Sequence, residues 1–533
     1  MENSVNSPPE RTTNRKAAII AAIVVVLVVV GGLGLYFHFR QTSSEVTITI
    51  AAPVYSSSTS IWENYLNNST AGWLKDHPGV TIKFVGPFGA SSEGQYYTKL
   101  DLMTSSSSTA PSLMLEDMFY TSTYVNSGVL LPLNKYVSNS TFSKYFPAAL
   151  DQMKVNGTYY GAPAQVTDTL IYYNKTLLQD AGISTPWQPK NWTDIINTAL
   201  QVKNTANLSG VIPLNVYEGV KADESSSFTG FEGLLYGTNW TLYNFTNDKW
   251  YGNNPGLYQT LNFYNTSFVK DKIATANLSA TPYITVGQYM QQGKLAIAED
   301  GSWMYGYQWA PGAQHSISNF SKYIGVAMIP TEFGQGQGYD TMVGGWGWAG
   351  YSGVANKSLV ASLAVALSNS TNSITANLPG EALAGGLPAT TTATGNPMFS
   401  KLMPTAPYLD TFYTQLLQYG KFRPPVSGYP QVSYQLDKAM SAVVHQTSSI
   451  PEALSAYSAA LNSTFGSHNV QIISPQITTA ASVFHNTFSD LVYPVKTNNE
   501  VTQYAQINME PLSMNTVIPS SVFELMKKQP EQS

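Results

Sequence analysis

Strand-like and helical segments alternate after residue 45, and this order restricts the fold more than any other feature of the chain. The stretch Val46–Ile50 alternates as a strand does, and residues 61–80 place apolar side chains on one helical face. A second strand and helix follow at 81–86 and 93–108, and a third strand at 111–118. Because consecutive strands joined by helices form parallel sheets, the pattern predicts a parallel α/β fold.

The same pattern resumes in the second part of the chain. Residues 157–174 contain two strand-like runs, and Trp192–Thr205 has the spacing of an amphipathic helix with Thr193 as its cap. Another strand is expected within 322–330 and another helix within 358–370. Single hydrophobic cores stop growing near roughly 250–300 residues. The chain of 533 residues is therefore expected to form two α/β lobes.

Composition excludes several classes of function. The sequence has no cysteine, which excludes disulfides, cysteine-ligated zinc and a thiol nucleophile. Its six histidines show no metal-ligand spacing, and it has neither a phosphate-binding loop nor a zinc-protease motif. Charged residues make up 11% and the formal net charge is −5, so no nucleic-acid partner is expected. We expect no metal and no cofactor.

The N-terminus predicts a membrane anchor. Arg11, Arg15 and Lys16 precede an apolar run at 17–39, which as a helix would span about 34 Å, enough to cross a bilayer. The basic residues before the run indicate a cytoplasmic N-terminus and an exported remainder. Because no small-residue cleavage site follows, residues 1–44 are interpreted as a retained transmembrane helix with its linker.

Glycosylation motifs also indicate export. The pattern N-x-[ST] occurs about fifteen times, although a chain rich in Asn, Ser and Thr forms some copies by chance. Low charge fits an acidic exterior, because protonating many carboxylates would unbalance a highly charged surface. The expected location is the cell membrane, crossed once, with an N-glycosylated bulk outside.

Five segments, taken in order, resemble one protein family. Val155–Ile196 carries Gly-x-x-Tyr-x-x-Pro, then Tyr-Asn, Ala-Gly-Ile-x-x-Pro and Trp-x-Asp. The other segments are residues 110–137, 289–303, 326–348 and 429–454. Each is weak alone. Together, from about Val46 to Phe465, they resemble the family 1 extracellular solute-binding proteins of ABC importers.

The resemblance implies a type II periplasmic-binding-protein fold, in which two lobes close like a clamshell about a hinge of three crossovers. The crossovers are expected near Pro163, near Ile329–Pro330 and after a helix that ends near Asn369. The corresponding divisions are 45–163 with 330–370 for lobe 1, 164–329 with 371–466 for lobe 2, and a C-terminal extension at 467–533 without an assigned role.

The resemblance also implies binding without covalent chemistry, hence no enzyme and no catalytic residue. The expected ligand is a mono- or oligosaccharide held between the lobes, and another small polar solute is the alternative. The expected partners are an ABC permease and, through it, an ATPase subunit. Some sugar-binding proteins of thermoacidophilic archaea carry pilin-like signals processed just before the apolar run. Such processing near Ala17 is the alternative to an uncleaved anchor.

Aromatic residues are the first candidates for sugar contact, because sugars present apolar C–H faces that pack on flat rings. In the family, the tryptophan after Gly-x commonly stacks on a sugar ring, and here that residue is Trp303. Trp346 and Trp348 lie among glycines, which allow the backbone to approach a ligand closely. Either they project from a loop at the mouth of the cleft, or they share one buried face of a strand.

Polar candidates lie at the ends of predicted strands. Asp117 ends a parallel strand, where such sheets place ligands, and Tyr55 follows the first strand. Gln165 and Asp168 lie just beyond the first crossover, where the family places polar contacts. A capping role is the alternative for each aspartate.

Three further candidates are Glu232, Asp340 and Tyr434. Tyr434 lies where some relatives carry a stacking tryptophan, and this departure leaves the identity and size of the sugar open. A glycoside hydrolase would need two carboxylates roughly 5–9.5 Å apart, and Glu116 with Glu232 is the pair to consider. A structural surface glycoprotein fits the sequons and the low charge, but the sequence has no repeats.

Overall fold

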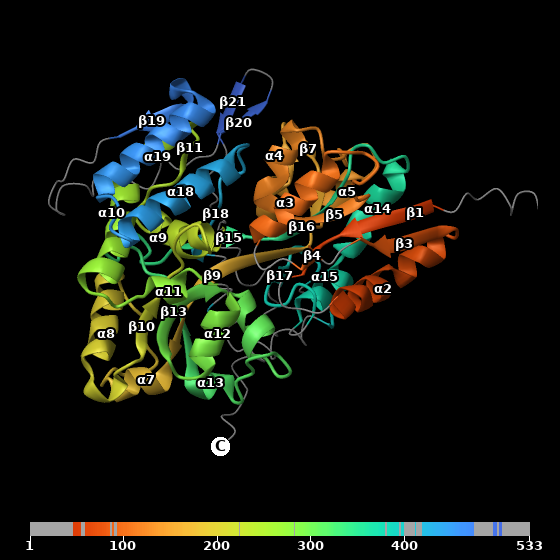
Figure 1. Ribbon diagram of the computed structural model, residues 1–533. Coiled ribbons are helices and arrows are strands. Elements are labelled where there is room, and N and C mark those ends of the chain that lie inside the picture. The colour runs from red at the N-terminus through yellow and green to blue at the C-terminus, as the bar shows by residue number, and fades with distance from the viewer. Residues whose placement is uncertain are drawn as a thin grey trace, which may run out of the picture.

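The structure is a computed structural model of the chain, and it is built around two central β-sheets (Figure 1). The described residues are 46–54, 59–85, 88–89, 93–222, 224–281, 283–378, 381–393, 396–398, 411, 418–473, 494–497 and 500–503.

The first sheet has five strands in the order β3–β1–β5–β16–β8. They are β1 (Val46–Ala51), β3 (Val80–Phe84), β5 (Leu113–Asp117), β8 (Gly161–Pro163) and β16 (Trp346–Gly350). β1 runs parallel to β3 and β5, whereas β16 runs antiparallel to β5 and β8. The three strands expected in the first part of the chain are therefore confirmed, and so is their parallel arrangement.

Helices pack around this first sheet. We call the sheet and these helices the first lobe. The main helices are α2 (Thr59–Asp76), α3 (Glu93–Thr104) and α14 (Lys357–Leu367). Helix α2 buries Trp62, Tyr65 and Leu66, whose spacing places them on one helical face. The ring of Trp62 packs edge-on against Trp348 of β16, with 6.4 Å between the ring centroids. This contact joins the helix to the sheet in one hydrophobic core.

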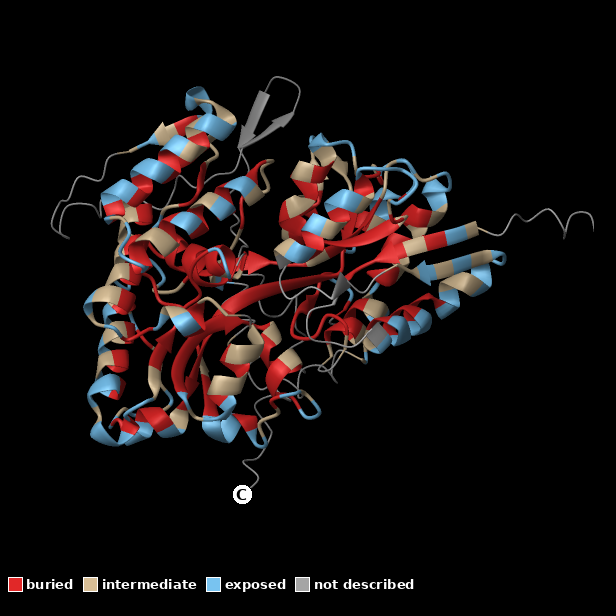
Figure 2. Cartoon of the chain, in the orientation of Figure 1, coloured by how far each residue is buried: buried red, intermediate tan, exposed pale blue. Residues whose placement is uncertain are grey.

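The second sheet is centred on β9 (Gln165–Asn174), and all 10 of its residues are buried (Figure 2). The strand order is β10–β13–β9–β15–β18, and β14 and β17 also pair with β9. Their bounds are β10 (Ile212–Asn215), β13 (Leu295–Gly301), β14 (Ile324–Ala327), β15 (Thr341–Gly344), β17 (Leu387–Pro388) and β18 (Gly420–Phe422). The strand and helix expected within 322–330 and 358–370 are confirmed as β14 and α14.

The second sheet and its helices form the second lobe. These helices include α7 (Lys175–Asp180), α8 (Trp192–Asn204), α10 (Pro255–Tyr264), α12 (Tyr283–Gln291), α13 (Phe320–Tyr323), α18 (Tyr429–Val444) and α19 (Ile450–Phe465). The cap predicted for α8 at Thr193 is wrong. Asn191 has an extended backbone, and its side chain accepts from the Asp194 amide at 2.9 Å, so the helix begins at Trp192.

Shorter elements complete both lobes. In the first half of the chain they are β2 (Pro53–Val54), β4 (Phe88–Gly89), η1 (Met118–Tyr120), α4 (Thr121–Asn126), α5 (Asn139–Phe142), α6 (Pro147–Gln152), β6 (Lys154–Val155), β7 (Thr158–Tyr159), η2 (Ala206–Leu208), η3 (Ser225–Glu232), α9 (Gly233–Tyr236), β11 (Tyr243–Asn244), β12 (Lys249–Asn253) and η4 (Asn265–Lys270). The later ones are α11 (Ala276–Ser279), η5 (Tyr305–Trp309), α15 (Ser370–Asn377), η7 (Ser467–Asn469), β19 (Val470–Ile472), β20 (Pro494–Thr497) and β21 (Glu500–Gln503).

The chain crosses between the two sheets at two positions that lie side by side in space. Ala164 separates β8 from β9, and Gly345 separates β15 from β16. The Ala164 amide donates to the Trp346 carbonyl at 2.7 Å. A crossover near Ile329–Pro330 is not what the structure shows, because β15 follows that segment and still pairs with β9. After α15 the chain rejoins the second sheet at β17.

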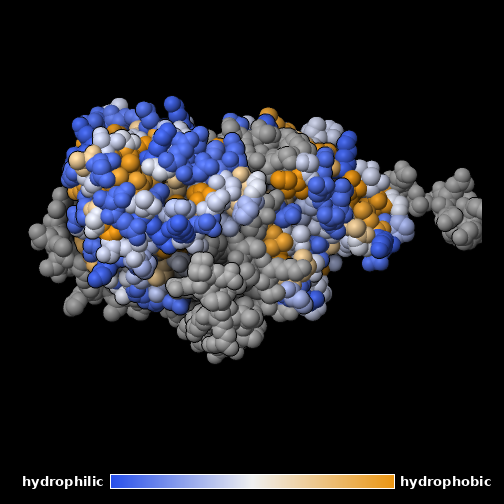
Figure 3. All heavy atoms as spheres, turned by 90° about the horizontal axis from the view of Figure 1, so that it is seen from below, coloured by the Kyte–Doolittle hydropathy of each residue, from blue (hydrophilic) through white to orange (hydrophobic). Residues whose placement is uncertain are grey.

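Exposed residues follow the outer faces of the helices (Figure 2), and hydrophilic residues cover much of the surface seen from below (Figure 3). Within the described residues, no helix is both long and apolar enough to cross a bilayer. The predicted span at 17–39 lies outside the described residues. From the predicted extension at 467–533, the structure describes η7, β19, which pairs with β12, and the hairpin of β20 and β21.

Candidate functional site

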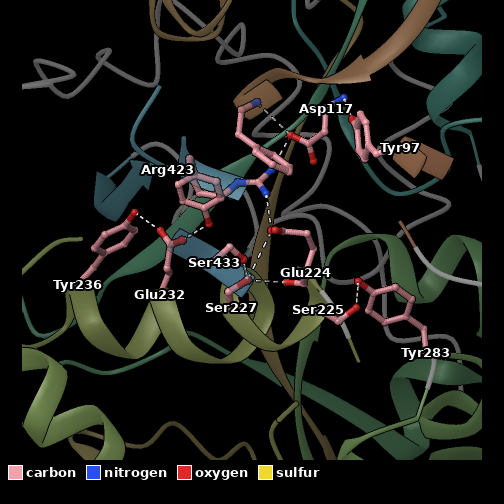
Figure 4. A network of polar contacts seen from close by, with 12 residues as sticks. Tyr97, Asp117, Glu224, Ser225, Ser227, Glu232, Tyr236, Tyr283, Arg423 and Ser433 are labelled. Atoms are coloured by element: carbon pink, nitrogen blue, oxygen red, sulfur yellow. Dashed lines mark hydrogen bonds and ion pairs between the residues drawn. The ribbon is translucent and has the colours of Figure 1, made fainter. Parts of the chain in front are cut away.

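A buried ion pair joins the two lobes where β5 and β18 end (Figure 4). Asp117 is the last residue of β5, and Arg423 directly follows β18. An Arg423 Nη2 to Asp117 Oδ1 distance of 2.5 Å links the lobes, and Arg423 Nη1 lies 3.6 Å from Oε2 of Glu224. All three residues are buried. One arginine is thus shared by carboxylates from both lobes.

Aromatic rings enclose the Arg423 guanidinium. Its central carbon lies 4.0 Å from the ring centroid of Phe119, 5.0 Å from that of Phe228 and 5.8 Å from that of Tyr429. These distances fall within the range of cation–π contact. A planar guanidinium suits such a setting because its faces stack while its edges donate to carboxylates.

Trp303 belongs to the same group of contacts. Its ring centroid lies 5.7 Å from that of Phe228 and 5.6 Å from that of Tyr283. Gly301 makes room for it, because a Cβ there would lie 2.1 Å from the indole ring. Among the described residues, the buried indole Nε1 of Trp303 has no hydrogen-bond partner. Trp303 thus contacts Phe228, and Phe228 contacts the arginine that pairs with Asp117.

Gln165 and Asp168 lie on β9, next to the crossover. The buried Oε1 of Gln165 has no hydrogen-bond partner among the described residues. Gly386 approaches this oxygen so closely that a Cβ would lie 2.2 Å from it. Asp168 is fully buried, and its carbonyl accepts from the Ser302 amide at 3.0 Å. Asp168 therefore supports, through the backbone, the turn that carries Trp303.

Trp346 and Trp348 lie on a strand, β16, and the expectation of a loop there is wrong. Antiparallel pairing with β5 places Trp346 opposite Asp117. Trp346 is partly buried and tilted against Tyr96, with 6.3 Å between the ring centroids. Trp348 is fully buried against Trp62 in the core of the first lobe. That is the placement of the alternative, in which both tryptophans share one strand face.

Close approach of backbones explains the glycines around this tryptophan pair. At Gly345 φ is +156°, and a Cβ would lie 2.2 Å from the Gln165 carbonyl oxygen. At Gly347 a Cβ would lie 2.2 Å from the Met153 sulfur. The glycines therefore serve the crossover and the packing of the sheet.

Of the remaining candidates, Glu232 adjoins the Arg423 group through Tyr429. Glu232 is buried and accepts hydrogen bonds from the hydroxyls of Tyr236 and Tyr429. Tyr55 lies outside the described residues. Asp340 forms an ion pair with Lys421 at 2.5 Å within the second lobe. Tyr434 is 48% exposed on α18, with Lys438 over its ring.

A family model described as Bacterial extracellular solute-binding protein matches residues 55–370, more than half of the chain. The chain belongs to this family. The resemblance drawn from the five segments is confirmed.

Curated relatives match a shorter stretch. The chain is 27% identical over 155 residues to an arabinooligosaccharide-binding protein from Halalkalibacterium halodurans, covering 28% of this chain and 33% of that protein. It is 26% identical over 162 residues to a binding protein of Brucella abortus, covering 30% of this chain and 36% of that one. The chain thus spans about a third of the length of these curated relatives.

Solved structures match over most of the chain. Maltose-bound MalE3 from T. maritima has a TM-score of 0.65 at 16% identity, covering 79% of this chain and 100% of that one. The GacH receptor of Streptomyces glaucescens, solved unliganded and with acarbose, has a TM-score of 0.62 at 18% identity, covering 79% and 98%. These likenesses show a mixed α/β periplasmic-binding-protein-like fold, which confirms that part of the expected fold class, whereas the N-terminal transmembrane helix stays a prediction.

The two acids considered for hydrolysis contact different partners in this solute-binding protein. Burial raises the pKa of Glu116 to about 8, although the Thr121 hydroxyl donates to it at 2.8 Å. Burial raises the pKa of Glu232 to about 7, while its two tyrosine partners and Arg423 act in the opposite direction. The matching family is described as solute-binding, and MalE3 was solved with bound maltose.

Sequence reasoning missed the central residue of the site, Arg423. One signal could have revealed it, because Arg423 is the only arginine after Arg40 in the entire sequence. In a chain that otherwise uses lysine for its positive charge, a single arginine marks a place that needs a planar cation. Phe228 and Glu224 were also missed, since their π-helical segment is set by tertiary packing and has no distinctive pattern.

Proposed function

We propose that this solute-binding protein holds a mono- or oligosaccharide between its lobes and delivers it to an ABC permease coupled to an ATPase subunit. The observation that carries the proposal is the group formed by Trp303, Phe228 and Tyr283 beside buried carboxyl and amide groups. Flat rings suit the C–H faces of a sugar, and acids and amides suit its hydroxyls. The arabinooligosaccharide-binding relative and the maltose-bound neighbour support the same class of ligand.

The mechanism is closure of the lobes around the ligand. The first two crossovers, at Ala164 and Gly345, are adjacent, so rotation at these positions would change the angle between the lobes. A sugar that contacts both lobes binds the closed form better and shifts the population toward it. No bond is made or broken in the ligand.

Domain limits follow from the crossovers. We place the first division at Ala164, as expected, and move the second from 330 to Gly345. The lobes are then 45–163 with 346–370, and 164–345 with 371–466, and 467–533 stays without a role.

We also propose that residues 17–39 anchor the protein in the cell membrane, with an N-glycosylated bulk outside. Protease digestion of intact cells tests the anchor, because a bulk protected from external protease would contradict it.

A titration of intrinsic tryptophan fluorescence with a sugar panel tests the proposal. We expect a saturable change with at least one uncharged sugar, because Trp303 lies at the site. Isothermal titration calorimetry with the same sugar should give a stoichiometry of one. If no sugar in a panel of arabino- and malto-oligosaccharides, pentoses, hexoses and polyols binds by either method, the proposed ligand class is wrong.

A further inference from the structure

Two ion pairs at the end of β18 make different connections. Lys421 lies on β18 and pairs with Asp340, which directly precedes the neighbouring β15, so this pair stays within the second lobe. Arg423 lies two residues further on and pairs with Asp117 of the first lobe. Both pairs have nitrogen–oxygen distances of 2.5 Å. The chain thus contains an interlobe pair and a matched pair inside one lobe.

Neighbouring contacts reinforce the interlobe pair. The Ser122 hydroxyl of the first lobe donates to the Pro425 carbonyl of the second at 2.6 Å. The rings of Phe119 and Tyr429 meet with 5.1 Å between their centroids. We call these two contacts and the Asp117–Arg423 pair the interlobe latch.

The positive charge of Arg423 lies beside acidic residues of both lobes. Arg423 is 2% exposed, and carboxylates from both lobes lie beside its nitrogens while rings lie against its faces. The cation on β18, Lys421, is paired with Asp340. An anionic solute held beside this latch would therefore face two buried carboxylates, Asp117 and Glu224, without an uncommitted charge on β18 to receive it.

We propose that Arg423 is a specificity-determining and positioning residue of the sugar site. By pairing with Asp117 across the lobes, Arg423 stabilises the closed form. Because the carboxylate of Asp117 neutralises the charge of the guanidinium, the closed site accepts uncharged polyhydroxy ligands and rejects phosphorylated or carboxylated ones. This inference rests on the proposed function for its ligand, but the closure that it describes can be measured without any ligand.

The first experiment measures the distance between the lobes in the ligand-free, full-length protein. Because the sequence has no cysteine, spin labels attach only at introduced sites. Leu102 on α3 of the first lobe is 69% exposed, and Tyr323 on α13 of the second lobe is 40% exposed, so cysteines at both accept labels. Electron-spin distance measurements are then made in the Arg423→Gln and Lys421→Gln backgrounds.

The expected result is a broader and longer distance distribution in Arg423→Gln than in the parent, with the Lys421→Gln distribution unchanged. Thermal unfolding of each variant confirms that it is folded before labelling. The proposal is overturned if Arg423→Gln and Lys421→Gln give the same distribution, because the interlobe pair would then contribute nothing to closure that an internal pair does not.

The second experiment compares ligands by calorimetry. The uncharged probes are maltotriose and arabinotriose, and the anionic probes are trigalacturonate and glycerol 3-phosphate. The affinity of Arg423→Gln for the uncharged probes should fall by about tenfold or more, because the closed form then lacks a buried charge pair. Asp117→Asn should gain affinity for the anionic probes relative to the parent, because it leaves the arginine with one carboxylate fewer.

The outcomes separate the two ideas. If the parent binds an anionic probe more tightly than every uncharged one, the specificity role of Arg423 is overturned. If no probe binds the parent but Arg423→Gln still loosens the lobes, the sugar function fails while the latch stands. If uncharged sugars bind the parent and Arg423→Gln equally well, the function stands and the latch is overturned.

Discussion

Single residues at this site show what local pattern can and cannot predict. Asp117 was selected because it ends a parallel strand, where α/β sheets place ligands, whereas Trp303 was selected from the family resemblance, and both stay predicted ligand contacts. Arg423 joins them, and it could not be placed because it meets Asp117 across 306 residues of sequence. Trp348 shows the opposite limit. Its neighbours suggested an exposed loop, yet its size and spacing fit a fully buried strand position against Trp62.

Replacement of Trp303 gives the most direct test at the residue scale. Trp303→Ala should weaken sugar binding by about 1–3 kcal/mol, because it removes a large aromatic contact surface at the site. Calorimetric titration with the sugar that binds the parent measures this loss. Trp240→Ala is the matched control, since Trp240 packs on Tyr251 of the second lobe. Equal affinity of the Trp303 variant and the parent would remove Trp303 from the site.

At the scale of elements, strand and helix order were predictable while boundaries and crossovers were not. The strands at 46–50, 81–86 and 111–118 follow from period and turn residues. The second crossover was expected near Ile329–Pro330 from the position it has in the family, about fifteen residues before Gly345, where the chain passes from the second sheet to the first. Only the pairing of β15 with β9 reveals the true position.

Two glycines with opposite surroundings test the crossover. Gly345→Ala should destabilise the protein by about 1–3 kcal/mol, because a Cβ there would lie 2.2 Å from the Gln165 carbonyl oxygen. Gly72 lies inside α2 with no atom within 4 Å of a Cβ position, so Gly72→Ala should stabilise by about 0.5–1 kcal/mol. Chemical denaturation measures both. A Gly345→Ala protein as stable as the parent would contradict the close approach at the crossover.

The cap of α8 gives a second test at this scale. Asn191→Ala should cost about 0.5–2 kcal/mol, because it removes the side-chain acceptor for the Asp194 amide. Thr193→Ala should cost less than Asn191→Ala, since Asn191 rather than Thr193 caps the helix. Denaturation curves that rank the two variants in the reverse order would contradict this assignment. Unglycosylated protein must be used, because both residues belong to one N-x-[ST] motif.

For the whole molecule, we expect buried acids to govern how stability depends on pH. Burial raises the pKa of Glu116 and of Asp300 to about 8, and that of Glu232 to about 7. Between about pH 4 and these values the folded protein holds protons that the unfolded chain has released. Each group therefore contributes stability that is fully present at low pH and is lost as the pH rises through its folded pKa.

We accordingly expect the protein to be more stable near pH 4 than near pH 8, in line with the acidic exterior inferred from composition. Melting temperatures in matched-ionic-strength buffers from pH 4 to pH 8 measure this. Glu116→Gln should reduce the fall in melting temperature between pH 4 and pH 8, because a neutral amide replaces the buried acid that loses its proton when the protein unfolds. A melting temperature that rises steadily from pH 4 to pH 8 would show that the buried acids do not dominate.

A crystal structure with the tightest-binding sugar of the panel would show whether the two lobes close over a sugar beside the interlobe latch. We predict a sugar ring against Trp303, between the lobes, with Arg423 still paired to Asp117. A sugar bound elsewhere, or one whose charged group has displaced Asp117 from Arg423, would show that the proposed site is wrong.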